Sequence, residues 1–183
     1  MSEKVLIQQC SPTLAGLKTG NMFSCDFETA AEMKKWLREW NKKLSSKGLR
    51  FLPLRYRNHR ALIYVYRPSR LKNDLEHRQA REILCSRGYS CEAPSLCVTE
   101  LIRKMKESEE FPHEIGLFLG YPPEDVYGFI ENKACGCKRV GFWKVYGDEQ
   151  KAVSLFAKYQ KCTDVYTRKW AGGRSVEQLT VAG

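Results

Sequence analysis

The sequence predicts a mixed α/β domain in which one mixed β-sheet is flanked by helices. Short extended runs alternate with helical patterns along the chain, and residues 49–67 contain two extended segments around a tight turn. This hairpin supplies an antiparallel pair, so the sheet is not purely parallel. The chain has 183 residues, of which 43% are hydrophobic, enough for one full core. We expect a single domain over residues 1–171 and a loose tail over 172–183.

The N-terminal elements are predicted from capping residues and hydrophobic spacing. Ser11 and Pro12 suit the start of a short helix that Gly20 would end, and residues 21–26 suit a strand. The strongest helical pattern follows over residues 28–48. Its apolar residues lie at helical spacing and form one stripe: Met33, Trp36, Leu37, Trp40 and Leu44.

The hairpin is predicted from its two extended segments, 49–55 and 60–67, which flank the turn sequence "YRNH". The second segment is rich in β-branched and aromatic residues, which favours a central strand. Two helices are expected next, over residues 70–87 and from Pro94-Ser95 to about Ser108.

The C-terminal half contains the pattern strand, turn and helix twice. Residues 115–119 form an apolar run that we interpret as a strand, and Glu124 and Asp125 favour the helix start after the turn. Residues 138–146 predict a second strand, again followed by a helix. A last strand is expected over residues 164–170.

Composition narrows the range of partners and compartments. The formal net charge of +10 attracts polyanions such as RNA, DNA, phosphorylated metabolites or an anionic membrane face. Nucleic acid is one of these partners but is not favoured over a small-molecule, peptide or other polyanionic ligand. No apolar run is long enough to cross a membrane. The start of the chain has no export signal, so the eight cysteines indicate thiols in a reducing cytoplasm.

Cys10 is the candidate nucleophile. A thiol just before a helix start would lie at the positive end of the helix dipole, which favours the reactive thiolate. His113 would be the general base, with Glu114 or another carboxylate to orient it. The alternative is that Cys10 is a small buried residue and that His113 caps the entrance of a strand.

Cys135 and Cys137 form a second candidate site, for a soft metal or for redox chemistry. Their Cys-x-Cys spacing is shorter than that of a zinc site, and no matching histidine pair follows. The alternative is that both are incidental thiols in a loop. The sequence leaves the cofactor unknown.

The hairpin carries a third candidate site, because arginines alternate there with tyrosines. On a sheet, such residues could stack bases and bind phosphates. The alternative is that the tyrosines face the core while the arginines are solvated. The candidate polyanion-binding residues are Arg55, Arg57, Arg60, Arg67 and Arg70.

Four stretches of the chain resemble an uncharacterised family of anaerobic Gram-positive bacteria, the domain of unknown function DUF3793. They are "CSPTLAGLKTGNMFSC", "YVYRPSRL", "FPHEIGLFLGYPPEDVYGFIEN" and "GFWKVYGDEQKAVSLFAKYQKC". The resemblance implies a bacterial cytoplasmic protein and brings no known activity, substrate or cofactor.

A shorter stretch resembles the NlpC/P60 cysteine hydrolases. In that family a cysteine followed by serine begins a helix, and a His-x-x-Gly strand supplies the base. Here the matching residues would be Cys10-Ser11 and His113 to Gly116. Gln9 and Pro12 depart from the family's Asp-Cys-Ser-Gly context.

The sequence therefore leaves the function unknown and supports three hypotheses. The first is a thiol-dependent enzyme that acts on acyl or amide bonds of a small or peptidic substrate. The second is a non-enzymatic binding module for RNA or another polyanion. The third is a metal or redox role of the cysteines.

Overall fold

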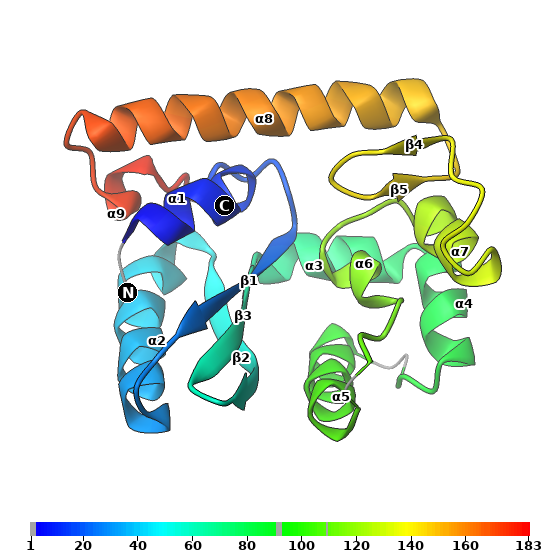
Figure 1. The fold of residues 1–183 in the computed structure, drawn as a ribbon, viewed down its shortest axis with the longest axis horizontal. Coiled ribbons are helices and arrows are strands. Elements are labelled where there is room, and N and C mark those ends of the chain that lie inside the picture. The colour runs from blue at the N-terminus through cyan, green and yellow to red at the C-terminus, as the bar shows by residue number, and fades with distance from the viewer. Residues whose placement is uncertain (1–2, 91–92, 109) are drawn as a thin grey trace. The chain divides into compact units, whose positions relative to one another are not determined.

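The computed structural model describes residues 3–90, 93–108 and 110–183 (Figure 1). These residues form helices and two small antiparallel sheets, which confirms the mixed α/β class. The chain divides into two compact units. The single domain predicted over residues 1–171 stays a prediction. Unit 1 comprises Met1–Arg70 and Lys161–Gly183, and unit 2 comprises Leu71–Gln160.

Unit 1 contains a three-stranded antiparallel sheet with the order β1-β3-β2. The strands are β1 (Gly20–Asp26), β2 (Arg50–Arg57) and β3 (Arg60–Tyr66), so the predicted hairpin and its central strand are confirmed. Asn58 and His59 both have positive φ values, 49° and 61°. This is the backbone of a two-residue turn whose twist matches that of the flanking strands.

Three helices of unit 1 share a hydrophobic core with this sheet (Figure 1). They are α1 (Glu3–Leu14), α2 (Ala30–Leu44) and α9 (Val176–Leu179), which packs on α1. The predicted stripe of α2 is confirmed, with Met33, Leu37, Trp40 and Leu44 all buried. The side chain of Thr29 accepts a hydrogen bond from the backbone N–H of Glu32 and caps the helix.

Two predicted boundaries in unit 1 are wrong. Helix α1 begins at Glu3 rather than Ser11, because Leu6, Ile7, Cys10 and Leu14 bury one helical face. Residues 164–170 belong to helix α8 (Glu149–Ala171) and form no strand. Their inward side chains, Tyr166 and Trp170, continue the helical spacing of the buried Cys162.

The segment after Gly172 is packed in unit 1, where the sequence predicted a loose tail. Ser175 and Gln178 form a capping box at the start of α9, and Val176 and Leu179 lie in the core. The Nζ of Lys47 donates to the carbonyl oxygens of Glu177 and Thr180. These polar contacts and the buried apolar side chains hold the segment in place.

Unit 2 is built from short helices and a small hairpin, so the two antiparallel sheets replace the single mixed sheet that we expected. The expected helix over 70–87 is divided at His77. The elements are α3 (Pro68–Glu76), α4 (Arg78–Ser86), α5 (Pro94–Glu107), α6 (Ile115–Phe118), α7 (Pro123–Glu131), β4 (Arg139–Val140) and β5 (Lys144–Val145).

The strand predicted over residues 115–119 is wrong, because this run forms helix α6. A short apolar run suits either a strand or a buried helix, and length alone does not separate them here. Gly116 permits the close packing of this helix, since a Cβ there would lie 2.8 Å from Cγ2 of Val126. The segment that follows leads directly into α7.

Candidate functional site

Unit 2 contains a cavity of about 340 Å³ whose walls are mostly apolar and include the aromatic side chains of Phe111, Tyr121, Phe129 and Trp143. The walls come from the loop at residues 111–113 and from α6, α7 and the β4–β5 hairpin. The first and last lining residues, Phe111 and Lys144, are 33 residues apart in sequence and meet only in the folded unit. All of the lining residues belong to unit 2.

Two aromatic pairs shape the cavity. The ring of Trp143 stacks on Tyr121 with 4.8 Å between centroids, and His113 meets Phe129 edge-on at 5.2 Å. Trp143 is buried and also contacts Phe156 at 4.5 Å, so its ring is held on two sides. Aromatic pairs in such geometries fix ring positions and create a rigid apolar wall.

Asp125 ties the hairpin to helix α7. Its buried carboxylate accepts hydrogen bonds from Trp143 Nε1 at 2.6 Å and from the backbone N–H groups of Tyr146 and Gly147 at 2.7 Å each. The residue lies in the first turn of α7, where the helix dipole stabilises a negative charge. Asp125 is therefore a structural carboxylate that positions the indole of Trp143.

Lys144 is the lysine that lines the cavity. Its Nζ donates to the carbonyl oxygen of Ala134 at 2.8 Å and lies 5.9 Å from the ring centroid of Phe129. It forms no ion pair with any residue in the described ranges. The cavity thus combines an aromatic wall with one ammonium group at its edge.

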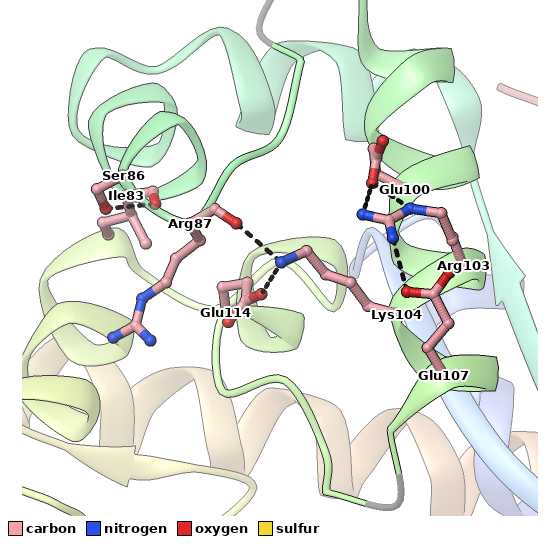
Figure 2. A network of polar contacts seen from close by, with 8 residues as sticks. All are labelled: Ile83, Ser86, Arg87, Glu100, Arg103, Lys104, Glu107 and Glu114. Carbon is pink, nitrogen blue, oxygen red and sulfur yellow. Dashed lines mark hydrogen bonds and ion pairs between the residues drawn. The ribbon is translucent and has the colours of Figure 1, made fainter.

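His113 and Glu114 are neighbours in sequence, but their side chains lie in different surroundings. His113 is exposed at the cavity wall. Glu114 is only 3% exposed, and its Oε1 lies 4.0 Å from the Nζ of Lys104 on α5. Figure 2 shows Lys104 reaching between this carboxylate and the carbonyl oxygen of Arg87, to which it donates at 2.8 Å.

The Lys104 contacts position the start of α6. The Nζ of Lys104 also lies 4.8 Å from the ring centroid of Tyr89. Burial and then the neighbouring Glu114 carboxylate raise the pKa of the Tyr89 hydroxyl. A separate exposed cluster on α5 joins Arg103 to two carboxylates, those of Glu100 and Glu107 (Figure 2).

Cys10 lies inside α1, on its fully buried face, rather than ahead of a helix start. Burial raises the pKa of its thiol from an ordinary value of 9.0 to about 12, and Lys18 opposes this effect only in part. The thiol therefore stays protonated at neutral pH. Cys10 belongs to unit 1 and His113 to unit 2. Their pairing as nucleophile and base stays a prediction.

Cys135 and Cys137 are free thiols in the loop after α7, the first exposed and the second half-buried. The described residues contain no group of three or more side chains that could bind a metal ion. A metal or redox role for this pair stays a prediction. Cys85 is disulfide-bonded, unlike the six free cysteines of the described ranges, and Cys91 lies outside those ranges.

The candidate polyanion-binding arginines occupy several environments. Arg57 and Arg60 are exposed and lie opposite each other at the hairpin tip, and Asp26 lies opposite Arg60 on β1. Arg55 is half-buried. Arg70 is exposed, and its Nη1 donates to the carbonyl oxygen of Gly16. A carboxylate beside the tip weakens its attraction for an anion.

Of the hairpin tyrosines, Tyr64 agrees with the core alternative, while Tyr56 and Tyr66 are half-buried. Tyr64 is fully buried, and its ring stacks on Tyr66 at 4.6 Å with an angle of 2° between planes. A buried ring offers no face to a nucleotide base.

Arg67 is the most buried of the candidate arginines, at 2% exposure. Its Nε donates to the carbonyl oxygen of Thr13 at 2.7 Å, and its Nη1 donates to that of Lys47 at 3.1 Å. Its Nη2 donates to the carbonyl oxygens of Leu14 and Val181 at 2.8 and 2.7 Å. The guanidinium thus joins α1, the segment after α2 and the C-terminal segment of unit 1.

Sequence reasoning identified His113 but missed the other cavity residues Tyr121, Phe129, Trp143 and Lys144. The available signal was the density of aromatic residues and glycines in "FPHEIGLFLGYPP" and "GFWKVYG". Those stretches were interpreted as strand and turn, so their aromatic side chains were not placed around a common space.

Comparison with known proteins gives a family but no activity. The model of the family described as "Protein of unknown function (DUF3793)" matches residues 6–180. The chain belongs to this family. No curated protein and no solved structure matches it. None of the helices in the described ranges has the length and apolar character needed to span a membrane.

Proposed function

We propose that the protein is a non-enzymatic binding module whose aromatic cavity in unit 2 binds a small ring-containing molecule. The observation that carries this proposal is the cavity itself, with a volume of about 340 Å³ and aromatic side chains on its walls. Small-molecule sites in proteins have volumes of roughly 300–1,000 Å³, apolar walls and a few polar groups.

The size of the cavity selects the class of ligand. A dry cavity of roughly 150 Å³ accommodates one benzene ring. A cavity about twice as large suits one or two fused rings with a short substituent. The rigid rings of Trp143 and Tyr121 favour a planar ligand, because flat rings pack against them with little loss of conformational freedom.

The other two hypotheses from the sequence have weaker support. The buried, protonated thiol of Cys10 does not favour nucleophilic catalysis. The guanidinium of Arg67 already donates to four carbonyl groups, which does not favour a polyanion site there. We also propose the cytoplasm as the compartment, since six of the seven cysteines in the described ranges are free thiols and Cys85 alone is disulfide-bonded.

The proposal is tested by titrating the full-length protein with indole and following ligand-detected NMR signals. We expect saturable binding, and we expect Phe129→Ala to weaken it about tenfold because one aromatic wall is lost. Tyr127→Ala is the matched control, since this tyrosine lies on the same helix and is exposed. Absence of saturable binding by the wild-type protein, or equal affinities of both variants, would contradict the proposal.

A further inference from the structure

We propose that the cavity of unit 2 selects an aromatic carboxylate, whose acid group pairs with Lys144 while its ring packs against Trp143 and Phe129. This inference rests on the proposed function and adds the chemical class of the ligand. It follows from comparing the positive and negative groups that line the cavity.

Lys144 has hydrogen-bonding capacity to spare. An ammonium group carries three N–H donors, and the contact with the Ala134 carbonyl, at 2.8 Å, uses one of them. The residue is half-buried, so its charge is partly removed from water. A cation in such a position gains more from an anionic partner than a fully exposed lysine does.

Asp125 is the acidic residue on the cavity wall, and its charge is already compensated. Three N–H groups donate to its carboxylate at 2.6–2.7 Å, and the start of α7 adds a favourable dipole. A carboxylate has about four acceptor positions, so few remain for a cationic ligand. The local balance therefore favours an anionic ligand group.

The arrangement of the walls lets one molecule contact the aromatic side chains and the Lys144 ammonium group together. Lys144 and Trp143 are consecutive residues that line the same cavity, and the Nζ of Lys144 lies 5.9 Å from the ring centroid of Phe129. A ring with a short acidic side chain can therefore meet the aromatic wall and the ammonium together. The net charge of +10 also favours the approach of anions over that of cations.

The test compares 3-phenylpropionate, 3-phenylpropanol and 3-phenylpropylamine, which share one ring and one spacer and differ in charge. We measure their dissociation constants for the full-length protein by NMR titration. We expect the acid to bind at least about tenfold more tightly than the alcohol, and the amine to bind most weakly.

The matched variants separate charge from hydrogen bonding. Lys144→Gln keeps an N–H donor for the Ala134 carbonyl but removes the charge, so the preference for the acid should disappear. Lys144→Arg should keep it. Lys151→Met is the control for net charge, because Lys151 is exposed on α8 and does not line the cavity. This control should bind all three compounds like the wild type.

The outcomes distinguish the two proposals. If the alcohol and the acid bind wild-type protein equally well, the carboxylate inference is overturned while the ligand cavity stands. If Lys144→Gln retains the preference, the assignment to Lys144 is overturned. If neither these compounds nor indole binds, the proposed function itself fails.

Discussion

The two units differ in how many protein partners their cationic side chains have and in how exposed their thiols are. In unit 1 the guanidinium of Arg67 donates to four carbonyl groups, and the thiol of Cys10 is fully buried. In unit 2 the ammonium of Lys144, a residue that lines the cavity, donates to one protein carbonyl, and the thiol of Cys135 is exposed. Arg67 and Cys10 are therefore enclosed in the core of unit 1, whereas Lys144 and Cys135 of unit 2 stay accessible.

This difference shows that burial of a charge does not by itself indicate a binding site. A buried cation such as Arg67, with four of its five N–H groups on protein carbonyls, stabilises the fold, because removing it leaves those carbonyl groups unpaired. A cation with unused donors beside a cavity can bind a ligand without breaking a protein contact. The number of protein carbonyls already bound, four by Arg67 and one by Lys144, therefore separates the roles of the two residues.

The largest contrast is expected in thiol reactivity. The rise of the Cys10 pKa from 9.0 to about 12 lowers its thiolate fraction at neutral pH about a thousandfold, and burial hinders access further. Peptide mass spectrometry after iodoacetamide treatment at pH 7–9 should show rapid labelling of Cys135 and almost none of Cys10. Across this pH range an ordinary thiol ionises, whereas Cys10 stays protonated.

The control is the same reaction in denaturant, where both cysteines should react at similar rates. If Cys10 and Cys135 react with iodoacetamide at comparable rates in the native protein, the predicted difference in thiol reactivity is wrong. That result would support Cys10 as a nucleophile.

The next largest effect is expected for Arg67. Arg67→Met keeps an apolar side chain of similar length but leaves four carbonyl groups without their donor, which should cost about 3 kcal/mol or more. In a thermal scan this corresponds to a fall in Tm of about 6–12 °C. Arg60→Met, at the exposed hairpin tip, should change Tm by about 1 °C or less.

Because Arg67 also donates to Val181, its loss should expose the C-terminal segment to carboxypeptidase. An unchanged Tm together with a protected C-terminus would show that these hydrogen bonds do not stabilise unit 1.

A smaller effect is expected in unit 2 for Lys104, which pairs with the buried Glu114. Lys104→Met leaves that carboxylate without its cation and should destabilise the protein by about 1–3 kcal/mol. Combining it with Glu114→Gln should recover part of the loss, since the two residues are coupled. Lys106→Met, on the exposed part of the same helix, is the control. Strict additivity of the two substitutions in urea unfolding would contradict the pairing.

The sequence predicted the local elements better than the site. The hairpin and α2 were predicted well because residue type and spacing determine them: β-branched and aromatic residues mark β3, and Met33 begins the helical stripe of α2. The role of Arg67 could not be predicted, because its carbonyl partners lie 20 to 114 residues away in sequence. The cavity was missed for the same reason, since packing of distant segments brings Phe129 and Trp143 around one space.

The smallest effect is expected at the hairpin tip. Arg57 and Arg60 lie opposite each other, but Asp26 lies opposite Arg60 on the neighbouring strand and offsets part of their charge. We expect the double substitution Arg57→Gln/Arg60→Gln to weaken binding of a single-stranded oligonucleotide less than about threefold at 150 mM salt. The slope of log affinity against log salt should change by less than about two, the value for two lost phosphate contacts. A larger loss, measured by fluorescence anisotropy, would show that the hairpin tip of unit 1 binds anions. Unit 2 would then no longer be the part of the molecule that alone has cations available to a ligand.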